Sequence, residues 1–235
     1  MRHCGRWSKF KQNMSRLFSY CIPIDDGAAP NPYWGICTLV ICKPVIRRNA
    51  EVGDWIVATG STKFGFENKV VYAMEVTQKI SMYDYDDFCK NQLPKKIPVW
   101  RGKNYIKRLG DSIYDFSVNP PKLRESVHNF DGKNEDGTHD LNGKFALLSD
   151  NFYYFGDNPI NLPTELFNIV KQGQGHKSNS NSPYFENFVN WISSFKSLKN
   201  KVNNPPYFKI RHDNEGICLN IRKEVAEIDE NSNDE

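Results

Sequence analysis

Three short runs rich in β-branched and aromatic residues, at residues 35–43, 54–60 and 69–78, most constrain how this chain can fold. Each run is bounded by Gly, Pro or Asn, which interrupt regular structure, so each is expected to form a β-strand. Within residues 69–78, one alternating set of side chains is apolar over Val70, Tyr72, Met74 and Val76, as in a strand with one face on a core. A small β-sheet is therefore the element around which the rest of the chain must pack.

Helical spacing of apolar residues adds several helices to this sheet. Ser81 is expected to cap a short acidic helix, and a later helix has Ser182 as its cap, Pro183 at its first position and one continuous apolar stripe. Helices are expected over residues 7–19, 81–88, 164–171 and 182–199, and further strands over residues 18–24, 146–155 and 207–221. This mixture of elements predicts an α+β fold.

Composition excludes several classes of protein. No stretch approaches the roughly eighteen consecutive apolar residues that a membrane-spanning helix needs, and the basic N-terminal residues precede no apolar segment of a secretory signal. The six cysteines form no C-x-x-C pair and have no histidine partner at zinc-finger spacing. We therefore expect a cytoplasmic protein with reduced cysteines, no metal, no cofactor and no contact with a membrane.

The net charge of +3 hides an uneven distribution along the chain. Residues 1–50 hold eight Lys or Arg and two acidic residues, whereas residues 224–235 hold six acidic residues and no base. A basic body is compatible with an anionic partner such as nucleic acid, although a charge excess is also common on a solvated surface. The acidic tail is expected to be disordered.

A basic, turn-rich segment connects the first two of the three predicted strands. It contains Lys43, Arg47 and Arg48, followed by a turn at Gly53 and Asp54 that leads into Trp55. Guanidinium groups on a rigid rim can make bidentate contacts with phosphate oxygens. Alternatively, Arg47 or Arg48 pairs with Asp54 and braces the turn, and both interpretations can hold for different arginines.

Aromatic residues are interleaved with these bases. Aromatic side chains can serve as stacking platforms for nucleic-acid bases, but most pack in protein interiors instead. Two further polar positions join the set, one where the second strand ends and one in the Gly-rich loop at residues 173–178. The residues expected to contact nucleic acid are Tyr33, Trp34, Lys43, Arg47, Arg48, Trp55, Ser61 and Lys177.

Histidines in polar loops supply candidate groups for catalysis. His139 and Asp140 follow a polar stretch, and His176 lies between Gly175 and Lys177. These side chains can transfer protons, but the sequence fixes no geometry between them, and loop histidines are often solvent-exposed without a catalytic role. They remain candidate acid and base groups only.

Motifs spread over residues 18–177 combine into a resemblance to a known family. They are Pro30-Asn31-Pro32-Tyr33-Trp34-Gly35, Cys37-Thr38-Leu39, Cys42-Lys43-Pro44, Ile46-Arg47-Arg48 and Gly53-Asp54-Trp55, followed by Leu148-Ser149, Phe152-Tyr153-Tyr154-Phe155-Gly156 and Gly175-His176-Lys177. Together they are similar to the second type of the nucleotide modification associated domain family. The resemblance implies a role in pathways that alter or recognise modified bases in phage and bacterial DNA, and it implies no particular reaction.

A broader resemblance concerns the fold. The Lys-Pro strand end, the Gly-Asp strand start and the Val-rich strand that follows are similar to PUA, ASCH and EVE domains, which are small curved barrels that hold nucleic acid. The resemblance implies a PUA-like curved β-barrel core with added helices, mainly in the C-terminal half. The expected organisation is a helical extension over residues 1–17, the family domain over 18–177, a helix and hairpin packed on it over 178–223, and the tail over 224–235.

Three functional hypotheses follow. The favoured one is a module that recognises a base in nucleic acid, a modified DNA base in particular, within a DNA modification or restriction pathway and alongside partner proteins of that system. The alternatives are an enzyme that modifies a base or nucleotide, and a protein-interaction module with a basic face. A pocket lined by Trp34, Trp55 and Arg47 would favour recognition, whereas His139 or His176 converging on that pocket would favour catalysis.

Overall fold

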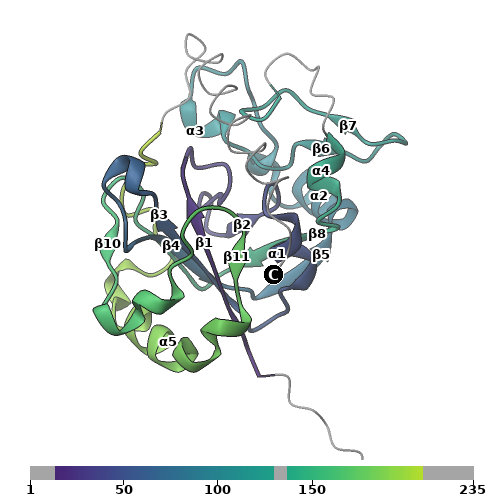
Figure 1. Ribbon diagram of the computed structural model, residues 1–235. Helices are drawn as coiled ribbons and strands as arrows, with labels where there is room; N and C mark the ends of the chain where they lie inside the picture. Colours follow the sequence, from purple (N-terminus) through teal and green to yellow (C-terminus); the bar gives the residue numbers. More distant parts are fainter. Residues whose placement is uncertain (1–13, 130–136, 209–235) are drawn as a thin grey trace, which may run out of the picture.

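The computed structural model of the protein describes residues 14–129 and 137–208. Two β-sheets pack against each other in these residues, and helices cover their outer faces (Figure 1). The fold is thus a mixed arrangement of strands and helices, as expected. Both sheets are open at their edges, and no closed barrel is found in the described part of the chain, so the PUA-like barrel is not borne out there.

The larger sheet supplies the frame of the molecule. It contains β1 (Leu17–Ile22), β3 (Trp55–Gly60), β4 (Lys69–Glu75), β9 (Phe152–Tyr154), β10 (Ile160–Asn161) and β11 (His176–Lys177). The strand order is β10-β4-β3-β1-β11, and β9 also pairs with β4. Strands β1 and β3 run parallel, with Leu17 opposite Trp55 and Ile22 opposite Gly60. The carboxyl ends of these two strands therefore meet at one edge of the sheet.

The smaller sheet packs on one face of the larger one. It contains β2 (Cys37–Leu39), β5 (Gln78–Ser81) and β8 (Phe145–Ser149) in the antiparallel order β2-β8-β5. The chain crosses between the sheets four times, from β1 into β2, from β2 into β3, from β4 into β5 and from β8 into β9, and the last two connections are only two residues long. A separate hairpin pairs β6 (Tyr114–Asp115) with β7 (Lys122–Leu123).

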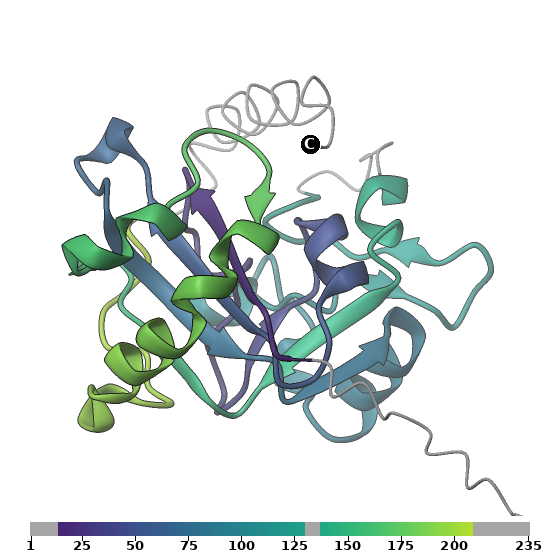
Figure 2. The same cartoon turned by 60° about the horizontal axis from the view of Figure 1, so that its bottom comes forward.

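Helices cover both outer faces of this two-sheet core. The α-helices are α1 (Pro44–Asn49), α2 (Met82–Asn91), α3 (Tyr105–Arg108), α4 (Gly137–Leu141) and α5 (Phe185–Ser193). The 3-10 helices are η1 (Thr62–Phe64), η2 (Pro94–Lys96), η3 (Thr164–Ile169), η4 (Asn179–Tyr184) and η5 (Lys196–Leu198). Helix α5 and its neighbouring 3-10 helices, green in Figure 2, lie across the outer face of the larger sheet. No helix of the described residues is long and apolar enough to span a membrane.

Alternation along the strands divides the interior into separate clusters. In β3, Ile56 and Ala58 face the cluster between the two sheets, whereas Trp55 and Val57 face the cluster under α5. A third cluster lies on the far side of the smaller sheet and includes Trp100. Because β3 is buried on both faces, it is a wholly apolar run apart from its last two residues.

Several sequence predictions are confirmed. The strands expected at residues 54–60 and 69–78 are present as β3 and β4, with Gln78 opening β5. Residues 146–155 contribute most of β8 and all of β9. Ser81 caps α2, because its hydroxyl accepts a hydrogen bond from the amide of Asp84 at 3.0 Å.

The N-terminal helix prediction is wrong at its described end. Leu17 and Phe18 lie in β1, so a helix over residues 7–19 cannot be continuous, although the strand expected over 18–24 is present. Strand β1 lies between β3 and β11 and is buried along nearly its whole length. Burial between two neighbouring strands outweighs a weak helical spacing. The first part of that predicted helix, residues 7–13, lies outside the described residues.

The first of the three predicted strands ends earlier than expected. Cys42 and Lys43 both have positive φ angles, 61° and 45°, which turn the chain out of an extended path. Pro44 then opens α1, consistent with its fixed φ angle. Arg47 and Arg48 therefore lie on a helix and not on an open connecting loop.

The C-terminal elements also differ in detail. The helix expected over residues 164–171 is the 3-10 helix η3, which ends at Ile169, and Ser182 with Pro183 lies in η4, so α5 begins at Phe185 and not at Pro183. Its apolar stripe is core as expected, since Phe188 and Ile192 are fully buried. Tyr207 and Phe208 are not in a strand, and the remainder of the predicted hairpin and the acidic tail lie outside the described residues.

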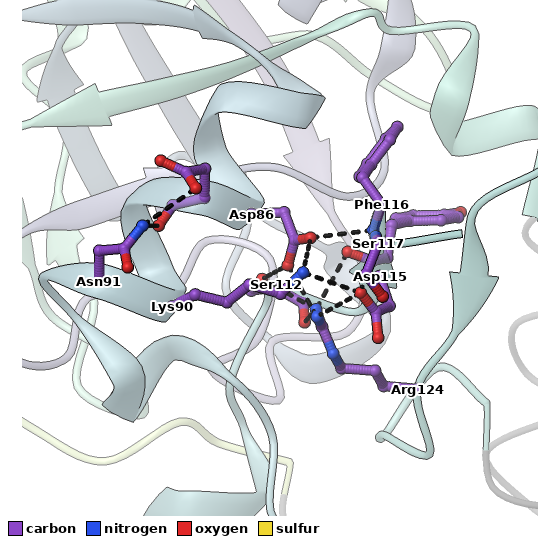
Figure 3. A network of polar contacts seen from close by, with 10 residues as sticks. Asp86, Lys90, Asn91, Ser112, Asp115, Phe116, Ser117 and Arg124 are labelled. Atoms are coloured by element: carbon purple, nitrogen blue, oxygen red, sulfur yellow. Dashed lines mark hydrogen bonds and ion pairs between the residues drawn. The ribbon is translucent and has the colours of Figure 1, made fainter. Parts of the chain in front are cut away.

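A network centred on Asp86 fastens the β6–β7 region to α2 (Figure 3). The buried carboxylate accepts hydrogen bonds from Arg124 at 2.7 Å and from the amide of Phe116 at 2.9 Å, and it pairs with Lys90 at 2.8 Å. Burial by itself would raise the pKa of Asp86, but these donors outweigh it and the pKa is lowered. The ionised carboxylate is thus part of the folded structure.

Asp54 braces the turn that leads into β3. Gly53 has a φ angle of 91°, and the carboxylate of Asp54 accepts hydrogen bonds from the amides of Arg16 at 2.7 Å and Glu51 at 2.9 Å. The guanidinium of Arg16 binds the same carboxylate at 2.7 Å. The arginine that pairs with Asp54 is therefore Arg16, and neither Arg47 nor Arg48 does so.

Replacing Asp54 with Ala should lower the free energy of unfolding by about 1–3 kcal/mol, because two backbone amides and a guanidinium lose their acceptor. Urea unfolding followed by tryptophan fluorescence measures this loss. Asp150→Ala, at an exposed carboxylate, is the matched control and should change stability little. An Asp54→Ala protein as stable as the parent would show that this carboxylate does not hold the turn.

Candidate functional site

A groove of about 250 Å³ lies where the carboxyl ends of β1 and β3 meet. Its walls come from the end of β1, from η1 and the loop after it, from the N-terminal end of α1, and from the loop between η3 and β11. The lining residues are Cys21, Pro23, Lys43, Gly60, Ser61, Thr62, Glu67, Asn68, Val170, Lys171, Gln172, Gly173 and Gln174. Ligands commonly bind at the carboxyl ends of parallel strands, because the loops there are free to diverge from the sheet.

The groove is lined by side chains that can bind an anion and a polar ring. Lys43 and Lys171 are cationic, and Glu67 is the anionic side chain of the lining. Asn68 and the two glutamines of the lining, with the hydroxyls of residues 61 and 62, offer both donors and acceptors. These side chains suit a ligand that carries a negative charge and a ring with several hydrogen-bond donors and acceptors.

Lys43 is held at the rim by an unusual backbone conformation. Its left-handed φ angle aims the side chain back across β1, and its Nζ atom lies 4.8 Å from the ring centroid of Tyr20. The hydroxyl of Tyr20 is 2.9 Å from that of Tyr72, so the ring is fixed. Burial raises the pKa of the Cys21 thiol, and the positive charge of Lys43 opposes that rise only in part.

Strand β11 brings His176 and Lys177 to the edge of the larger sheet. His176 is paired with Tyr20, and its ring lies 5.9 Å from that of Phe18. Lys43 and His176, far apart in the sequence, are therefore both neighbours of Tyr20. The ammonium of Lys177 donates to the carbonyl of Asn168 and helps to hold the loop that lines the groove.

Arg47 lies in the interior and not on a phosphate-binding rim. Its guanidinium is fully buried and donates to the carbonyls of Cys42 at 2.8 Å, Phe145 at 3.0 Å and Asp140. Burial lowers the pKa of Arg47, and the nearby carboxylate of Asp140 opposes this effect. A Cβ atom at Gly143 would collide with the guanidinium, so the absence of a side chain there makes room for it. Arg47 ties α1 to α4 and β8, which leaves it no access to a nucleic-acid backbone in this conformation.

Trp55 is buried as well. It is 3% exposed, stacks on Tyr153 at 6.4 Å between ring centroids and contacts Phe188 edge-on at 6.1 Å. An indole in this position cannot stack on a base without opening the larger sheet. The structure therefore offers no pocket that joins Trp34, Trp55 and Arg47.

The remaining residues expected to bind nucleic acid are dispersed. Tyr33 is buried and packs on the half-buried Trp34, beside the smaller sheet. Arg48, on α1, donates to the carbonyl of Asn142 at 2.9 Å. Of the eight residues, Lys43 and Ser61 line the groove described above.

The candidate acid and base groups do not form one site. His139 is exposed on α4, whereas the neighbouring carboxylate of Asp140 accepts a hydrogen bond from the amide of Cys42 at 2.6 Å. His176 belongs to β11 on the larger sheet. Within residues 14–129 and 137–208, no group of three or more His, Cys, Asp or Glu side chains could hold a metal ion.

A buried cation missed by the sequence analysis lies beside the smaller sheet. The ammonium of Lys96 is fully buried and donates to the side-chain oxygen of Asn31 at 2.7 Å, to the carbonyl of Ile36 at 2.9 Å and to the hydroxyl of Thr38 at 2.8 Å. Asp111, also fully buried, accepts from the hydroxyls of Thr38 at 2.5 Å and of Tyr85 at 2.6 Å. Burial lowers the pKa of Lys96 and raises that of Asp111.

The sequence gave little indication that Lys96 is buried. Lys95 and Lys96 are adjacent, as on a solvated surface, and the burial of Lys96 depends on a strand more than fifty residues earlier. The available signal was Thr38, a polar residue inside an otherwise apolar run. A polar side chain in a buried strand indicates a hydrogen-bonded partner from elsewhere.

Another buried carboxylate lies just beyond the groove, in the segment after β1. Asp25 is fully buried, and it accepts hydrogen bonds from the hydroxyl of Tyr154 at 2.6 Å and the amide of Gly27 at 3.1 Å. Burial raises the pKa of Asp25 from 3.8 to about 7, and these hydrogen bonds counteract the rise in part.

Comparison with known families identifies the chain. The model of nucleotide modification associated domain 2 matches residues 14–212, which include every element described above, and the chain belongs to this family. The resemblance seen in the sequence motifs is thereby confirmed. Neither the curated proteins nor the solved structures contain a significant match.

The pKa of Asp25 predicts how stability depends on pH. Because the folded state holds this proton more tightly than the unfolded state, the contribution of Asp25 to stability should be complete below pH 3.8 and should decline as the pH rises to about 7. Asp25→Asn removes the titration and should remove that decline. The melting temperature of the variant, minus that of the parent, should therefore increase across this range and then level off.

Thermal unfolding of both proteins in matched buffers from pH 4 to pH 8 tests this expectation. Asp150→Asn, at an exposed carboxylate, controls for the loss of a charge. A difference between the Asp25→Asn and parent melting temperatures that stays constant over the range would refute the assignment of the titration to Asp25.

Proposed function

We propose that this protein recognises one nucleotide of a nucleic acid, with a modified DNA base as the preferred target, and that the groove at the ends of β1 and β3 is its binding site. The observation that carries the proposal is the pair of lysines, Lys43 and Lys171, on a groove whose lining also includes hydroxyl, amide and carboxylate side chains. Membership of the family supports the connection to nucleotide modification. The protein would act in the cytoplasm within a phage or bacterial modification or restriction pathway.

The chemistry of the groove matches the parts of a nucleotide. A lysine ammonium is a compact charge that binds phosphate well. Glu67 can accept a hydrogen bond from an exocyclic amine, and Asn68 can bind a base edge through both its donor and its acceptor groups. A cavity of about 250 Å³ has no room for a duplex, so the base would enter singly, from a single strand or after extrusion from a helix.

Recognition is favoured over catalysis because the lining of the groove includes none of the three candidate acid and base groups, His139, Asp140 and His176. His139 is on α4, and the carboxylate of Asp140 is bound to the amide of Cys42. His176 lies on β11, opposite Tyr20 of β1, the strand whose end lines the groove. Binding a nucleotide through phosphate contacts and base edges requires no such pair.

Replacing Lys43 or Lys171 with Ala should weaken binding of a short single-stranded oligonucleotide by about tenfold, since each removes a charge-assisted contact of about 1.5 kcal/mol or more. Fluorescence anisotropy with oligonucleotides carrying unmodified and modified bases measures the affinities. Lys199→Ala removes an exposed charge at the opposite edge of the larger sheet and is the matched control.

The same samples distinguish recognition from catalysis. Mass spectrometry of the oligonucleotides after prolonged incubation should reveal no new product. A product that disappears in His176→Ala or His139→Ala would make the protein an enzyme. If Lys43→Ala, Lys171→Ala and Lys199→Ala all bind as the parent does, the groove is not the binding site.

A further inference from the structure

One long stretch of the chain contains many basic residues and no acidic ones. Residues 88–110 contain seven Lys or Arg and neither Asp nor Glu. This stretch begins within α2 and runs through η2 to the residues just after α3. It contributes no residue to the groove.

Three of the seven bases are engaged within the protein. Lys96 is buried, Lys90 pairs with Asp86 at 2.8 Å, and Arg101 binds Glu125 through two hydrogen bonds of 2.8 and 3.0 Å. These contacts hold parts of the stretch to the rest of the protein. The other four positive charges form no ion pair with a carboxylate of the described residues.

The other four bases make up an exposed cationic surface, which we call the basic lobe: Lys95, Lys103, Lys107 and Arg108. The three lysines are exposed, and no carboxylate in the described part of the chain pairs with them. The guanidinium of Arg108 lies 6.0 Å from the ring centroid of Trp100 and donates to the carbonyl of Gly102 at 2.7 Å.

The backbone that carries the basic lobe is well anchored. Asn104 caps α3 by accepting from the amide of Ile106 at 3.0 Å, and the amide of Val99 donates to the carbonyl of Lys107 at 2.8 Å. Trp100 is buried beneath the lobe at 3% exposure. Cations on a rigid backbone keep their spacing, so less ordering is required when they bind a polyanion.

The basic lobe lies at the same edge of the molecule as the groove. The hydroxyl of Tyr105, in α3, contacts the carbonyl of Asp26 at 3.4 Å, and the side-chain amide of Asn31 donates to the carbonyl of Leu109 at 2.5 Å. Residues 25–31 follow directly after β1, whose end lines the groove. In Figure 1, α3 lies beyond the upper, carboxyl end of β1.

We infer that the basic lobe binds the sugar–phosphate backbone of the strand whose nucleotide occupies the groove, so that the ligand is a nucleic-acid polymer and not a free nucleotide. The inference rests on the proposed function for its first binding site. Phosphates that neighbour the bound nucleotide would contact Lys95, Lys103 and Lys107, and each contact would release condensed counterions. The groove would then select the nucleotide, while the basic lobe would supply affinity that does not depend on sequence.

Comparing two ligands tests the inference with the full-length protein. One ligand is a deoxynucleoside monophosphate, and the other is a single-stranded twelve-residue oligonucleotide that carries the same nucleotide at its centre. The oligonucleotide should bind at least tenfold more tightly. Lys103→Ala combined with Lys107→Ala should remove most of that gain and leave the affinity for the monophosphate unchanged.

The salt dependence supplies a second measurement. The double variant should reduce the slope of log affinity against log salt concentration by about 1.4, because each lost phosphate contact on a single strand contributes about 0.7. The control is Lys196→Ala combined with Lys199→Ala, which removes two exposed lysines that follow α5 at the opposite edge of the larger sheet. This control should keep the parental slope.

The outcomes separate the two proposals. If the oligonucleotide binds no more tightly than the monophosphate, or if the lobe variant and the control variant behave alike, the basic lobe is not a binding surface and the groove proposal stands. If oligonucleotide binding depends on the lobe but survives Lys43→Ala and Lys171→Ala, the lobe is supported and the groove is wrong. If neither ligand binds, both proposals fail.

Discussion

The ammonium of Lys96 joins parts of the protein that are distant in the chain. Burying a charge is costly unless hydrogen bonds satisfy it, and here residues 31, 36 and 38 provide the acceptors, with the carboxylate of Asp111 close by. The segment after β1, strand β2 and the basic stretch are all fixed relative to one another through this point. The groove and the basic lobe can share one edge of the molecule because this buried ion holds their supporting segments together.

The two kinds of cation in this chain behave differently. Arg16, Arg47 and Lys96 have their donors used inside the protein, on carboxylate and carbonyl oxygens. The partly buried lysines of the groove and the exposed lysines of the basic lobe pair with no carboxylate in the described residues. Net charge counts both kinds equally, so the excess of bases before residue 50 does not show which of them are accessible to an anion, and Arg47 of that segment is fully buried. The location of uncompensated cations in three dimensions is more informative than their number.

Much of the local structure could be predicted from sequence, because it depends on near neighbours. The alternation in β4 and the capping serine of α2 are complete within ten residues. Whether a side chain is buried depends on residues far away in the sequence, and the predictions that required accessible side chains were wrong for this reason. Arg47 and Trp55 had the right chemistry for nucleic acid, but partners about one hundred residues later enclose them.

The groove shows the same division. Lys43 and Ser61 were expected to contact nucleic acid from their place at strand ends, and both do line it. Lys171 and Glu67 were missed, since they come from loops that meet only because β1 and β3 are parallel and in register. The pairing of distant strands determines which loops are neighbours, and a single sequence contains little information about that pairing.

The two shortest connections between the sheets, each only two residues long, have a mechanical consequence. Because β4 continues into β5 and β8 continues into β9, each sheet contains strands that are covalently continuous with strands of the other. Separating the sheets would strain both connections at once and expose the apolar cluster between them. The molecule should therefore open as one cooperative unit, with amide hydrogens of both sheets exchanging at similar rates under conditions where global unfolding dominates.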